Sequence, residues 1–271
     1  MLYDMHIHSR VSHDGRESGC DIAKACVEKN ISAFAITDHC DIQLCDEMDV
    51  FAKVQGSLEE AKIAREAYKD KVKVLLGIEI GEAIWNLDYA KNILSTLDFD
   101  VVIGSVHAVR YKGHYDAYST IDFSKFSEKM LGEYLNLYFD ELLETLKTVP
   151  IDIMAHLTCP LRYINGKYQR NVSSRTYETK ITKILEYIID HKIPMEINTS
   201  GANGSIVNLM PDEWIIEKYK QMGGTLVTLG SDAHAKERVG NYFNEAIALL
   251  KSLGFNSYCY FENRQIKHCN I

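Results

Sequence analysis

The chain alternates short apolar runs with longer amphipathic segments, and this alternation constrains its fold more than any other feature. About seven of these strand–helix units follow one another along the sequence. Such a repeat predicts a parallel sheet, and the continuous apolar runs are typical of strands that are covered on both faces. The 271 residues suit one α/β barrel or two small domains. Because no Pro/Gly/Ser-rich linker divides the chain, we expect one domain over residues 1–271 with the sheet closed into a barrel.

The expected elements follow from the periodicity of apolar residues and from turn signals. Strands are expected at residues 2–8, 32–37, 72–80, 99–106, 151–155, 193–198 and 225–229, with a last strand at 258–261. Helices are expected at residues 18–30, 49–69, 86–95, 126–147, 175–191, 211–222 and 240–253. Residues 110–121 and 157–173 are expected to be loops, and loops of this length are often functional.

The composition excludes several classes of protein. A hydrophobic share of 46% and a charged share of 25% are ordinary for a globular chain. The formal net charge of -8 does not supply the uniform basic field that nucleic-acid binding usually needs. The seven cysteines are odd in number and form no C-x-x-C pair, which favours reduced thiols in a cytosolic protein. With no signal peptide and no apolar run long enough to span a membrane, we expect a cytoplasmic protein without a membrane partner.

The first strand ends in two histidines, His6 and His8. Successive side chains of a strand point to opposite faces, so these two imidazoles point the same way while Met5 and Ile7 point to the other face. Neutral histidine is the commonest metal ligand in proteins. A lone H-x-H pair is a weak signal, and its meaning depends on whether other strands bring matching groups to the same place.

Other strand ends do carry such groups. The ionisable residues at the ends of the later strands are Asp38, His39, Glu79, His107, His156, Glu196, Asp232 and His234. Each alone would be read as a buried ion-pair partner, a helix cap or a structural histidine. In a parallel barrel, however, all the carboxyl ends of the strands share one rim, which is where active sites are built. Scattered structural histidines would not favour that rim, whereas His114, His191 and His268 are expected to be structural.

Imidazole and carboxylate ligands without thiolates suit Zn, Fe or Mn. The donors outnumber the ligands of one four-coordinate ion, so the sequence predicts two or three divalent transition metals. Glu79 is placed to bridge two of them. Bridged metals can clamp the attacking and leaving oxygens of a phosphoryl transfer and can lower the pKa of a bound water to near neutrality.

The ordered set of motifs resembles the PHP superfamily (polymerase and histidinol phosphatase). The motifs are H-x-H at 6–8, an S-x-D-G-like run at 12–15, T-D-H at 37–39, G-x-E at 77–79, G-S-x-H at 104–107, A-H at 155–156 and S-D-A-H at 231–234. The length and the long middle helix look like the monofunctional histidinol-phosphate phosphatases of that superfamily. The resemblance spans nearly the whole chain and implies a distorted (β/α)7 barrel of the TIM-like type with a trinuclear metal site.

The resemblance also implies which residues bind the metals. The first metal would be held by His6, His8, Glu79 and Asp232, the second by Glu79, His107 and His156, and the third by Asp14, His39 and His234. His13 stands next to Asp14 and is only a reserve ligand. The implied reaction is the hydrolysis of L-histidinol phosphate to L-histidinol and phosphate, a step of histidine biosynthesis, by a metal-bridging hydroxide. Asp232 or His234 would handle the proton, and the sequence does not decide between them.

Substrate recognition is less well defined by the sequence. A guanidinium suits an anionic phosphate, and Arg162 matches an arginine that is expected in these phosphatases. The run 198–201, which includes Ser200, fits the family, but the basic residue usual soon afterwards is absent because residues 202–204 are Ala-Asn-Gly. Arg110 or Arg238 would then replace it. This departure leaves the particular small phosphate ester open.

Three functions are therefore compared. The first is a metal-dependent phosphomonoesterase that acts on histidinol phosphate or on another small phosphomonoester. The second is a PHP-type phosphodiesterase or exonuclease acting on nucleotides, which the acidic charge disfavours for long polymers. The third is a metal-binding structural or regulatory protein without turnover, which would be expected to lack some of the ligands. The sequence leaves open the metal, the general acid, the oligomeric state and whether residues 110–121 act as a lid.

Overall fold

The computed structural model describes residues 1–202 and 208–271. The strands are β1 (Leu2–Ile7), β2 (Ile31–Ile36), β3 (His39–Asp41), β4 (Lys73–Gly81), β5 (Val101–Ser105), β6 (Ile153–Met154), β7 (Met195–Asn198), β8 (Val227–Gly230), β9 (Ser257–Glu262) and β10 (Gln265–Asn270). The α-helices are α1 (Gly19–Glu28), α2 (Val50–Tyr68), α3 (Leu87–Thr96), α4 (Glu128–Thr148), α5 (Cys159–Gly166), α6 (Glu178–Asp190), α7 (Glu213–Gln221) and α8 (Phe243–Ser252). Short 3₁₀ helices are η1 (Ile42–Leu44), η2 (Ala83–Asn86), η3 (Phe123–Lys125), η4 (Ser174–Tyr177) and η5 (Lys236–Arg238).

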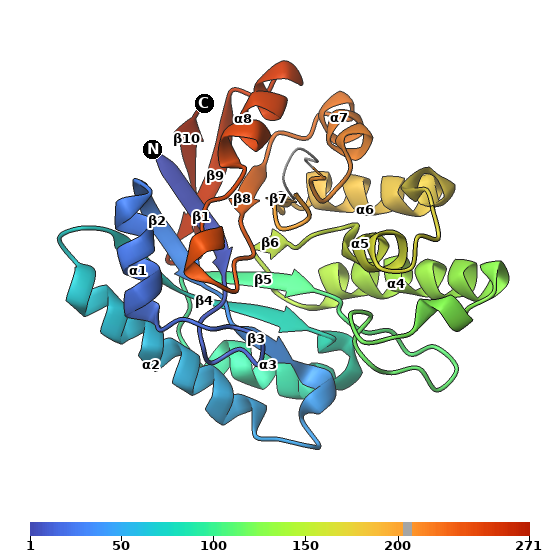
Figure 1. Ribbon diagram of the computed structural model, residues 1–271, viewed down its shortest axis with the longest axis horizontal. Coiled ribbons are helices and arrows are strands. Elements are labelled where there is room, and N and C mark those ends of the chain that lie inside the picture. Colours follow the sequence, from blue (N-terminus) through green and yellow to red (C-terminus); the bar gives the residue numbers. More distant parts are fainter. Residues whose placement is uncertain (203–207) are drawn as a thin grey trace.

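The strands form one sheet in the order β1-β2-β4-β5-β6-β7-β8-β9-β10, and β3 pairs with β4 beside β2. All neighbouring strands from β1 to β9 are parallel, and only β9 and β10 pair antiparallel. The helices surround the curved sheet, with α1 to α3 on one side of it and α4 to α8 on the other in the view of Figure 1. This arrangement confirms the predicted α/β fold with a parallel sheet.

The sheet curves so far that β8, with the residues that follow it, lies beside β1. The two strands share no continuous ladder, but Ile7 and Ala233 form a parallel bridge. The backbone N–H of His8 donates to the carbonyl of Ala233 over 2.9 Å, and the N–H of Asp232 donates to the carbonyl of His6 over 2.8 Å. These bonds place the first H-x-H pair directly beside the S-D-A-H run, although the two motifs are more than two hundred residues apart in the chain.

Local sequence signals explain where several helices begin. The Ser18 hydroxyl accepts a hydrogen bond from the N–H of Asp21 over 3.2 Å, so Ser18 caps the start of α1. Ser127 caps α4 in the same way, by accepting from the N–H of Met130 over 3.2 Å. Helix α4 buries an apolar stripe formed by Leu131, Leu135, Tyr138 and Leu142.

The structure corrects the sequence-based elements in three places. Residues 157–173 were expected to be a loop but contain α5, which has Pro160 in its first turn, where proline is tolerated. The strand β3 has only three residues, too few to show a period of two in the sequence. The final strand β10 is mostly polar and pairs as a hairpin with β9. The expected loop at 110–121 contains no helix or strand apart from the bridge of Tyr111 with His114.

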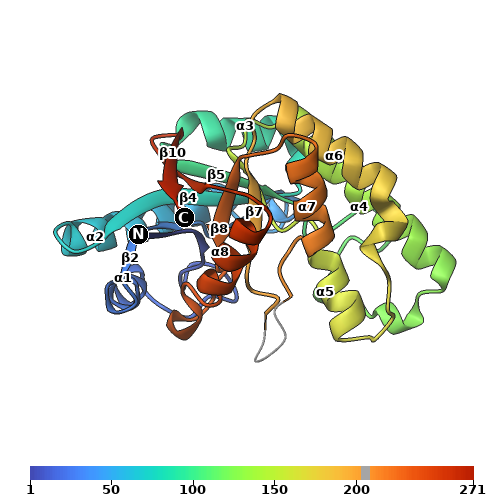
Figure 2. The same ribbon diagram turned by 90° about the horizontal axis from the view of Figure 1, so that it is seen from above.

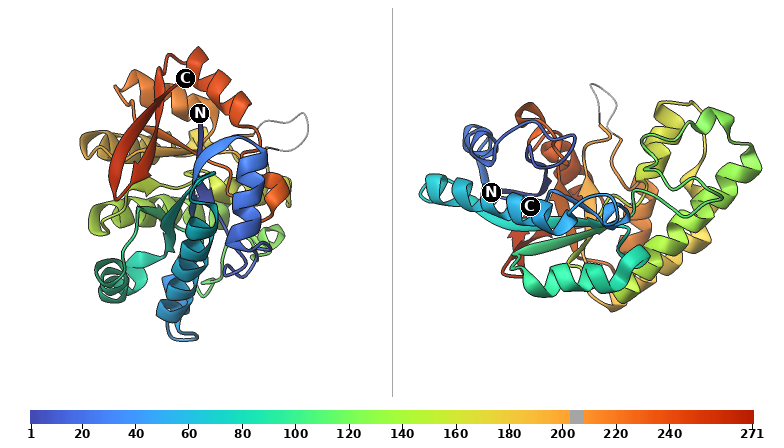
Figure 3. Two further views of the ribbon diagram at one scale, coloured as in Figure 1. Left: turned by 90° about the vertical axis from the view of Figure 1, so that its left-hand side faces the viewer. Right: turned by 90° about the horizontal axis from the view of Figure 1, so that it is seen from below.

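The two chain ends lie next to each other, as all the views in Figures 1 to 3 show. The Tyr258 hydroxyl on β9 donates to the carbonyl of Met1 over 2.9 Å, and it accepts from the N–H of Tyr3 over 3.2 Å. Strand β9 therefore covers the start of β1 at the rim opposite the histidines. Among the described residues, none of the helices combines the length and the apolar character that a membrane crossing needs.

Candidate metal centre

The structure gathers the nine predicted metal ligands at the carboxyl ends of the strands. The nine are His6, His8, Asp14, His39, Glu79, His107, His156, Asp232 and His234, and each lies within 4.0 Å of at least one other member. Their burial is uneven, because Glu79 is fully buried at the centre while Asp14 is exposed at the edge. A carboxylate surrounded by imidazoles in a buried position is an arrangement that binds cations.

Four donor atoms converge in the first group. The Nε2 atoms of His6 and His8 are 3.0 Å apart, and they lie 3.5 and 3.6 Å from Oε2 of Glu79. Oδ1 of Asp232 is 3.8 Å from Nε2 of His6 and 3.3 Å from Nε2 of His8. Ligands about 2.0–2.1 Å from a tetrahedral zinc are separated from each other by about 3.3 Å. The separations of these atoms match that value, so the group fits a four-coordinate divalent metal.

The second group is built on the other oxygen of the same glutamate. Oε1 of Glu79 lies 3.1 Å from Nε2 of His107 and 2.9 Å from Nε2 of His156. His107 follows β5 and His156 follows β6, which are consecutive strands of the sheet. The two oxygens of Glu79 thus face different sets of histidines, which is the arrangement that a bridging carboxylate requires.

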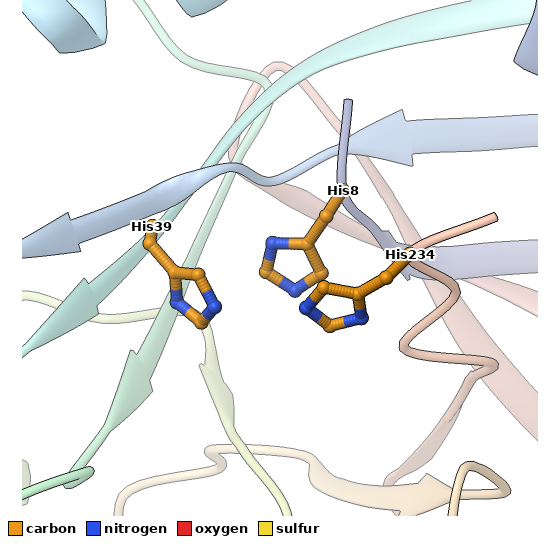
Figure 4. A group of neighbouring side chains, drawn as sticks. All are labelled: His8, His39 and His234. Carbon is orange, nitrogen blue, oxygen red and sulfur yellow. The ribbon is translucent and has the colours of Figure 1, made fainter. Parts of the chain in front are cut away.

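The third group lies nearest the surface. Figure 4 shows the rings of His8, His39 and His234 turned toward one another, and they form one of the donor groups whose ligand atoms lie within 4.8 Å of each other. Asp14 adds a carboxylate, with Oδ2 at 3.1 Å from Nε2 of His234 and Oδ1 at 3.7 Å from Nε2 of His39. In addition, Nδ1 of His39 lies 2.8 Å from Oε2 of Glu79, which connects this group to the first.

Hydrogen bonds alone do not satisfy these donors. Glu79 Oε2, His39 Nδ1 and His234 Nε2 are all buried and make no hydrogen bond within the described parts of the chain. Glu79 and His39 are close enough for such a bond but are not aligned for it. Buried polar atoms without partners are rare in folded proteins, and a site for a bound ion is one established cause. The residues present therefore fit a cluster of divalent metals.

The electrostatics of the cluster couple metal binding to the release of protons. Burial would raise the pKa of Glu79, but His107 and His6 outweigh it and lower that pKa well below its usual range. The carboxyl pKa of Asp232 is lowered for the same reason, chiefly by His6. Burial and the neighbouring His234 lower the pKa of His8 to about 3, so its imidazole is neutral. Burial would lower the pKa of His6 and His107, but the carboxylates of Glu196 and Glu79 outweigh it and raise both values well above the usual range. Because ionised carboxylates and neutral imidazoles are the forms that bind metals, a bound metal would displace a proton from each of these two rings.

A cavity of about 640 Å³ opens over the cluster. Its lining includes six of the nine predicted ligands and the rim residues Arg162 and Ser200. Nη1 of Arg162 donates to the Ser200 hydroxyl over 2.8 Å, and this hydroxyl lies 3.0 Å from Oδ2 of Asp232. Arg162 stands on α5, so the unexpected helix sets the position of the guanidinium beside the metal ligands.

The remaining residues of the predicted site are divided between the cavity and the surface. The guanidinium of Arg110 lies 4.8 Å above the ring of Trp85, and Arg110 is not among the residues that line the cavity. Arg238 does line it and donates to the carbonyl of Ala202 over 3.3 Å. His13 is exposed at its edge, with its ring 5.4 Å from that of His39. The run at 202–204 lies partly outside the described residues, because 203–207 are not described.

The sequence reasoning did not identify a second set of buried acids around the ligands. Oδ1 of Asp38 accepts from the Ser12 hydroxyl over 2.8 Å, and that hydroxyl lies 3.1 Å from Nδ1 of His8. Oδ1 of Asp41 lies 3.3 Å from Nδ1 of His107, and Glu82 accepts from the backbone N–H of Ala108 over 2.8 Å. The T-D-H motif contains the first of these acids, but nothing in the spacing marks the other two.

Fold and site together define a class of protein, the parallel α/β barrels that carry histidine and carboxylate metal donors at the carboxyl ends of their strands. The chain belongs to the PHP domain family, which matches residues 4–200. The predicted resemblance is thereby confirmed, and it covers the stretch from the first H-x-H pair to Ser200.

Relatives match along almost the full length. The chain is 29% identical to a probable histidinol-phosphatase of Clostridium acetobutylicum, covering 99% of this chain and 100% of that one. It is 24% identical to the histidinol-phosphatase of Lactococcus lactis, covering 97% and 95% of the two chains. Among solved structures, the histidinol phosphate phosphatase of Lactococcus lactis, complexed with zinc, L-histidinol and phosphate, has a TM-score of 0.75 at 22% identity and covers 98% of both chains. At this identity, the structural match establishes the fold.

Proposed function

We propose that the chain is a metal-dependent phosphomonoesterase that hydrolyses L-histidinol phosphate to L-histidinol and phosphate. One observation carries the proposal, namely the donor cluster at the base of a cavity whose rim presents the guanidinium of Arg162. Full-length similarity to proteins named histidinol-phosphatase supports the choice of substrate. The chain acts as one domain over residues 1–271 in this proposal.

The metal ligands are proposed to be the nine residues already described, in three groups: the first two share Glu79, and the third adjoins the first at His8 and His39. Zinc fits the separations of the first group, while imidazole and carboxylate ligands also suit Fe and Mn. Metals bound there would supply Lewis acidity to the phosphate oxygens and would lower the pKa of a water molecule toward neutrality. The protein's own contribution is to hold these donors in fixed positions before the substrate arrives.

Arg162 and Ser200 are proposed to bind the phosphate. The guanidinium offers paired N–H donors that match two phosphate oxygens. Its present partner, the Ser200 hydroxyl, is a neutral group, and no carboxylate lies within ion-pair distance of Arg162 among the described residues. The arginine is therefore free to neutralise an anion in the cavity. Arg238, on the same lining, is the candidate for the second cation.

We propose different roles for Asp232 and His234, because their side chains have different hydrogen-bond partners. Nδ1 of His234 donates to the backbone carbonyl of Asp232 over 2.9 Å, so Nε2 is the ring atom that remains for a metal. Asp232 turns Oδ1 toward the histidines, while Oδ2 lies 3.0 Å from the Ser200 hydroxyl. Because its neighbour Ser200 lines the cavity, Oδ2 is the oxygen proposed to accept a proton during attack.

The test is a phosphate-release screen of the metal-loaded protein. The panel contains histidinol phosphate, other metabolite monoesters and a dinucleotide phosphodiester. The expected result is the highest kcat/KM for histidinol phosphate. Preference for another monoester would support the proposed phosphomonoesterase reaction but would contradict histidinol phosphate as the substrate. Preference for the diester would favour the exonuclease alternative, and a protein that binds metals without any turnover would favour the structural one.

A further inference from the structure

We infer that Glu196 is the positioning residue of the metal centre: its carboxylate holds the ring of His6 and the main chain of His156 in metal-binding geometry. The inference rests on the metal centre of the proposed function, but not on the identity of the substrate. It concerns a residue outside the nine proposed ligands.

Strand β7 lies between β6 and β8 in the sheet, yet it supplies none of the proposed ligands. Nevertheless Glu196, in the middle of this strand, is only 1% exposed. A buried carboxylate is costly unless hydrogen bonds compensate for the loss of water. The side chain must therefore satisfy its two oxygens within the barrel.

Both oxygens of Glu196 bond to residues that carry metal ligands. Nδ1 of His6 donates to Oε1 over 2.7 Å, and the backbone N–H of His156 donates to Oε2 over 2.7 Å. The side-chain amide of Asn198 donates to Oε2 as well, over 3.1 Å. The carboxylate of Glu196, on β7, thus connects His6 on β1 to His156, which follows β6.

The bond to His6 decides which ring nitrogen can bind a metal. An ionised carboxylate only accepts hydrogen bonds, so Nδ1 of His6 carries a hydrogen and Nε2 is the ring atom that is left to bind a metal. That Nε2 is the atom that faces Glu79, His8 and Asp232. Carboxylates that accept from the second nitrogen of a ligand histidine fix its orientation and increase its basicity. Glu196 meets this description for His6.

The bond to His156 acts through the main chain. It fixes the backbone at the residue whose Nε2 lies 2.9 Å from Oε1 of Glu79. Glu196 consequently supports a ligand of the first group and a ligand of the second, the two groups that share Glu79. A single side chain therefore sets the relative position of two donors on which neighbouring metals depend.

The S-D-A-H region leaves room for this side chain. A Cβ atom at Gly230 would stand 2.1 Å from Oε1 of Glu196 and 2.8 Å from Cβ of His6. The glycine before the motif is thus explained by the space that the carboxylate and its histidine need.

The experiment compares Glu196→Gln with Asp100→Asn. Asp100 is a second buried acid that accepts two backbone N–H groups, from Leu76 over 2.8 Å and Asn263 over 3.1 Å, but it lies at the opposite end of the sheet. The full-length proteins are stripped of metal, checked by circular dichroism and titrated with Co²⁺, whose visible absorption reports the ligand geometry. Bound metal is counted by elemental analysis.

Glu196→Gln is expected to bind Co²⁺ about 10–100-fold more weakly, the usual cost of losing a partner of a ligand histidine. However the amide turns, it cannot accept from both His6 and His156. The absorption spectrum should change as well, because the ring of His6 is no longer held. Asp100→Asn should bind Co²⁺ with the affinity and spectrum of the wild type, even if its stability is lower.

Glu196→Asp is the second variant, which keeps the charge but shortens the side chain by one methylene, and the same weakening is expected. Wild-type affinity and spectrum in Glu196→Gln would overturn the inference, as would equal losses in Asp100→Asn. If neither Glu196 variant folds while Asp100→Asn does, the residue is a folding determinant and the inference is wrong. A wild type that binds Co²⁺ but does not hydrolyse histidinol phosphate would overturn the proposed substrate and leave this inference intact.

Discussion

Nε2 of His6 lies 3.0 Å from Nε2 of His8, with both side chains buried and Nδ1 of each ring directed toward another residue. Two lone pairs at this distance repel each other unless one Nε2 carries a proton that it donates to the other or a metal ion lies beside both. The carboxylates of Glu79 and Asp232 complete the surroundings of the pair. The pair therefore needs either a shared proton or a metal ion, and a metal would satisfy the two rings and the two carboxylates together.

Removal of metal is accordingly expected to destabilise the protein. A ligand present at about 1,000 times its Kd stabilises the folded state by about 4 kcal/mol. In a chain of this size, 1 kcal/mol corresponds to roughly 2–4 °C in Tm. We expect a chelator to lower Tm by roughly 10 °C and added Zn²⁺ or Mn²⁺ to restore it. Differential scanning fluorimetry with and without chelator measures the shift, and an unchanged Tm would contradict a resident metal centre.

Replacement of His8 by alanine should abolish phosphate release while the fold survives. His8 belongs to the first donor group and also faces His39 and His234, so its loss affects two of the proposed metals. Losing a direct ligand should cost more than the 10–100-fold typical of an outer partner, so we expect kcat to fall by more than about 100-fold. His191→Ala is the matched control, because that histidine is exposed at the end of α6. Full activity in His8→Ala would remove His8 from the centre.

The sequence was sufficient to predict the fold class and to locate the donors, and the reason is the alternation itself. A parallel sheet brings every carboxyl strand end to one rim, so residues such as His39 and His156 become neighbours once their strands are recognised. The structure places both within reach of Glu79. The motif comparison then supplied Asp14, which no strand end would have indicated.

The sequence was not sufficient for features that depend on three-dimensional packing. Helix α5 has eight residues and a proline in its first turn, so its apolar periodicity was too short to distinguish from a loop. The acids Asp41 and Glu196 look like any other polar residue at a strand end, because their role depends on which ring nitrogen they meet. Arg110, named as a replacement for the basic residue absent after 198–201, lies over Trp85 and is not among the residues that line the cavity.

Arg162 is expected to contribute to substrate binding through its paired N–H groups. Arg162→Lys keeps the charge but loses the two-pronged geometry, so kcat/KM should fall by about 10-fold, and Arg162→Met should lower it by about 100-fold. Arg175→Met is a suitable control, because Arg175 is also exposed and lies 4.6 Å from the ring of Trp214. Steady-state kinetics with histidinol phosphate measure kcat/KM for each variant and show whether Arg162→Met loses more than Arg162→Lys. Equal effects of the two Arg162 variants would show that charge alone matters.

The buried carboxyl of Asp152 should make stability depend on pH. Burial raises its pKa to about 6, although Arg264 and the N–H of Val102 oppose the shift. An unfolded aspartate titrates near about 3.9. The folded state therefore binds the proton more tightly, and the contribution of Asp152 to stability falls as the pH rises from about 4 to about 6.

At roughly 1.4 kcal/mol per pKa unit, the free energy of unfolding of the wild type should fall by about 2–3 kcal/mol relative to that of Asp152→Asn over this pH window. Urea unfolding of both metal-free proteins at several pH values measures the difference, and parallel profiles would contradict the prediction.

Gly230→Ala should damage the metal centre without removing any ligand. The new methyl group would stand 2.1 Å from Oε1 of Glu196 and 2.8 Å from Cβ of His6, and neither atom can move without breaking the 2.7 Å bond between the two side chains. Overpacking of this kind costs about 1–3 kcal/mol of stability, and the displaced His6 should weaken metal binding as well. Gly132→Ala is the control, since a Cβ there meets nothing within 4 Å inside α4 and should stabilise the helix by about 0.5–1 kcal/mol. Urea unfolding and Co²⁺ titration of both variants separate the two effects. Wild-type metal affinity in Gly230→Ala would mean that the carboxylate of Glu196 can move while the centre keeps its geometry.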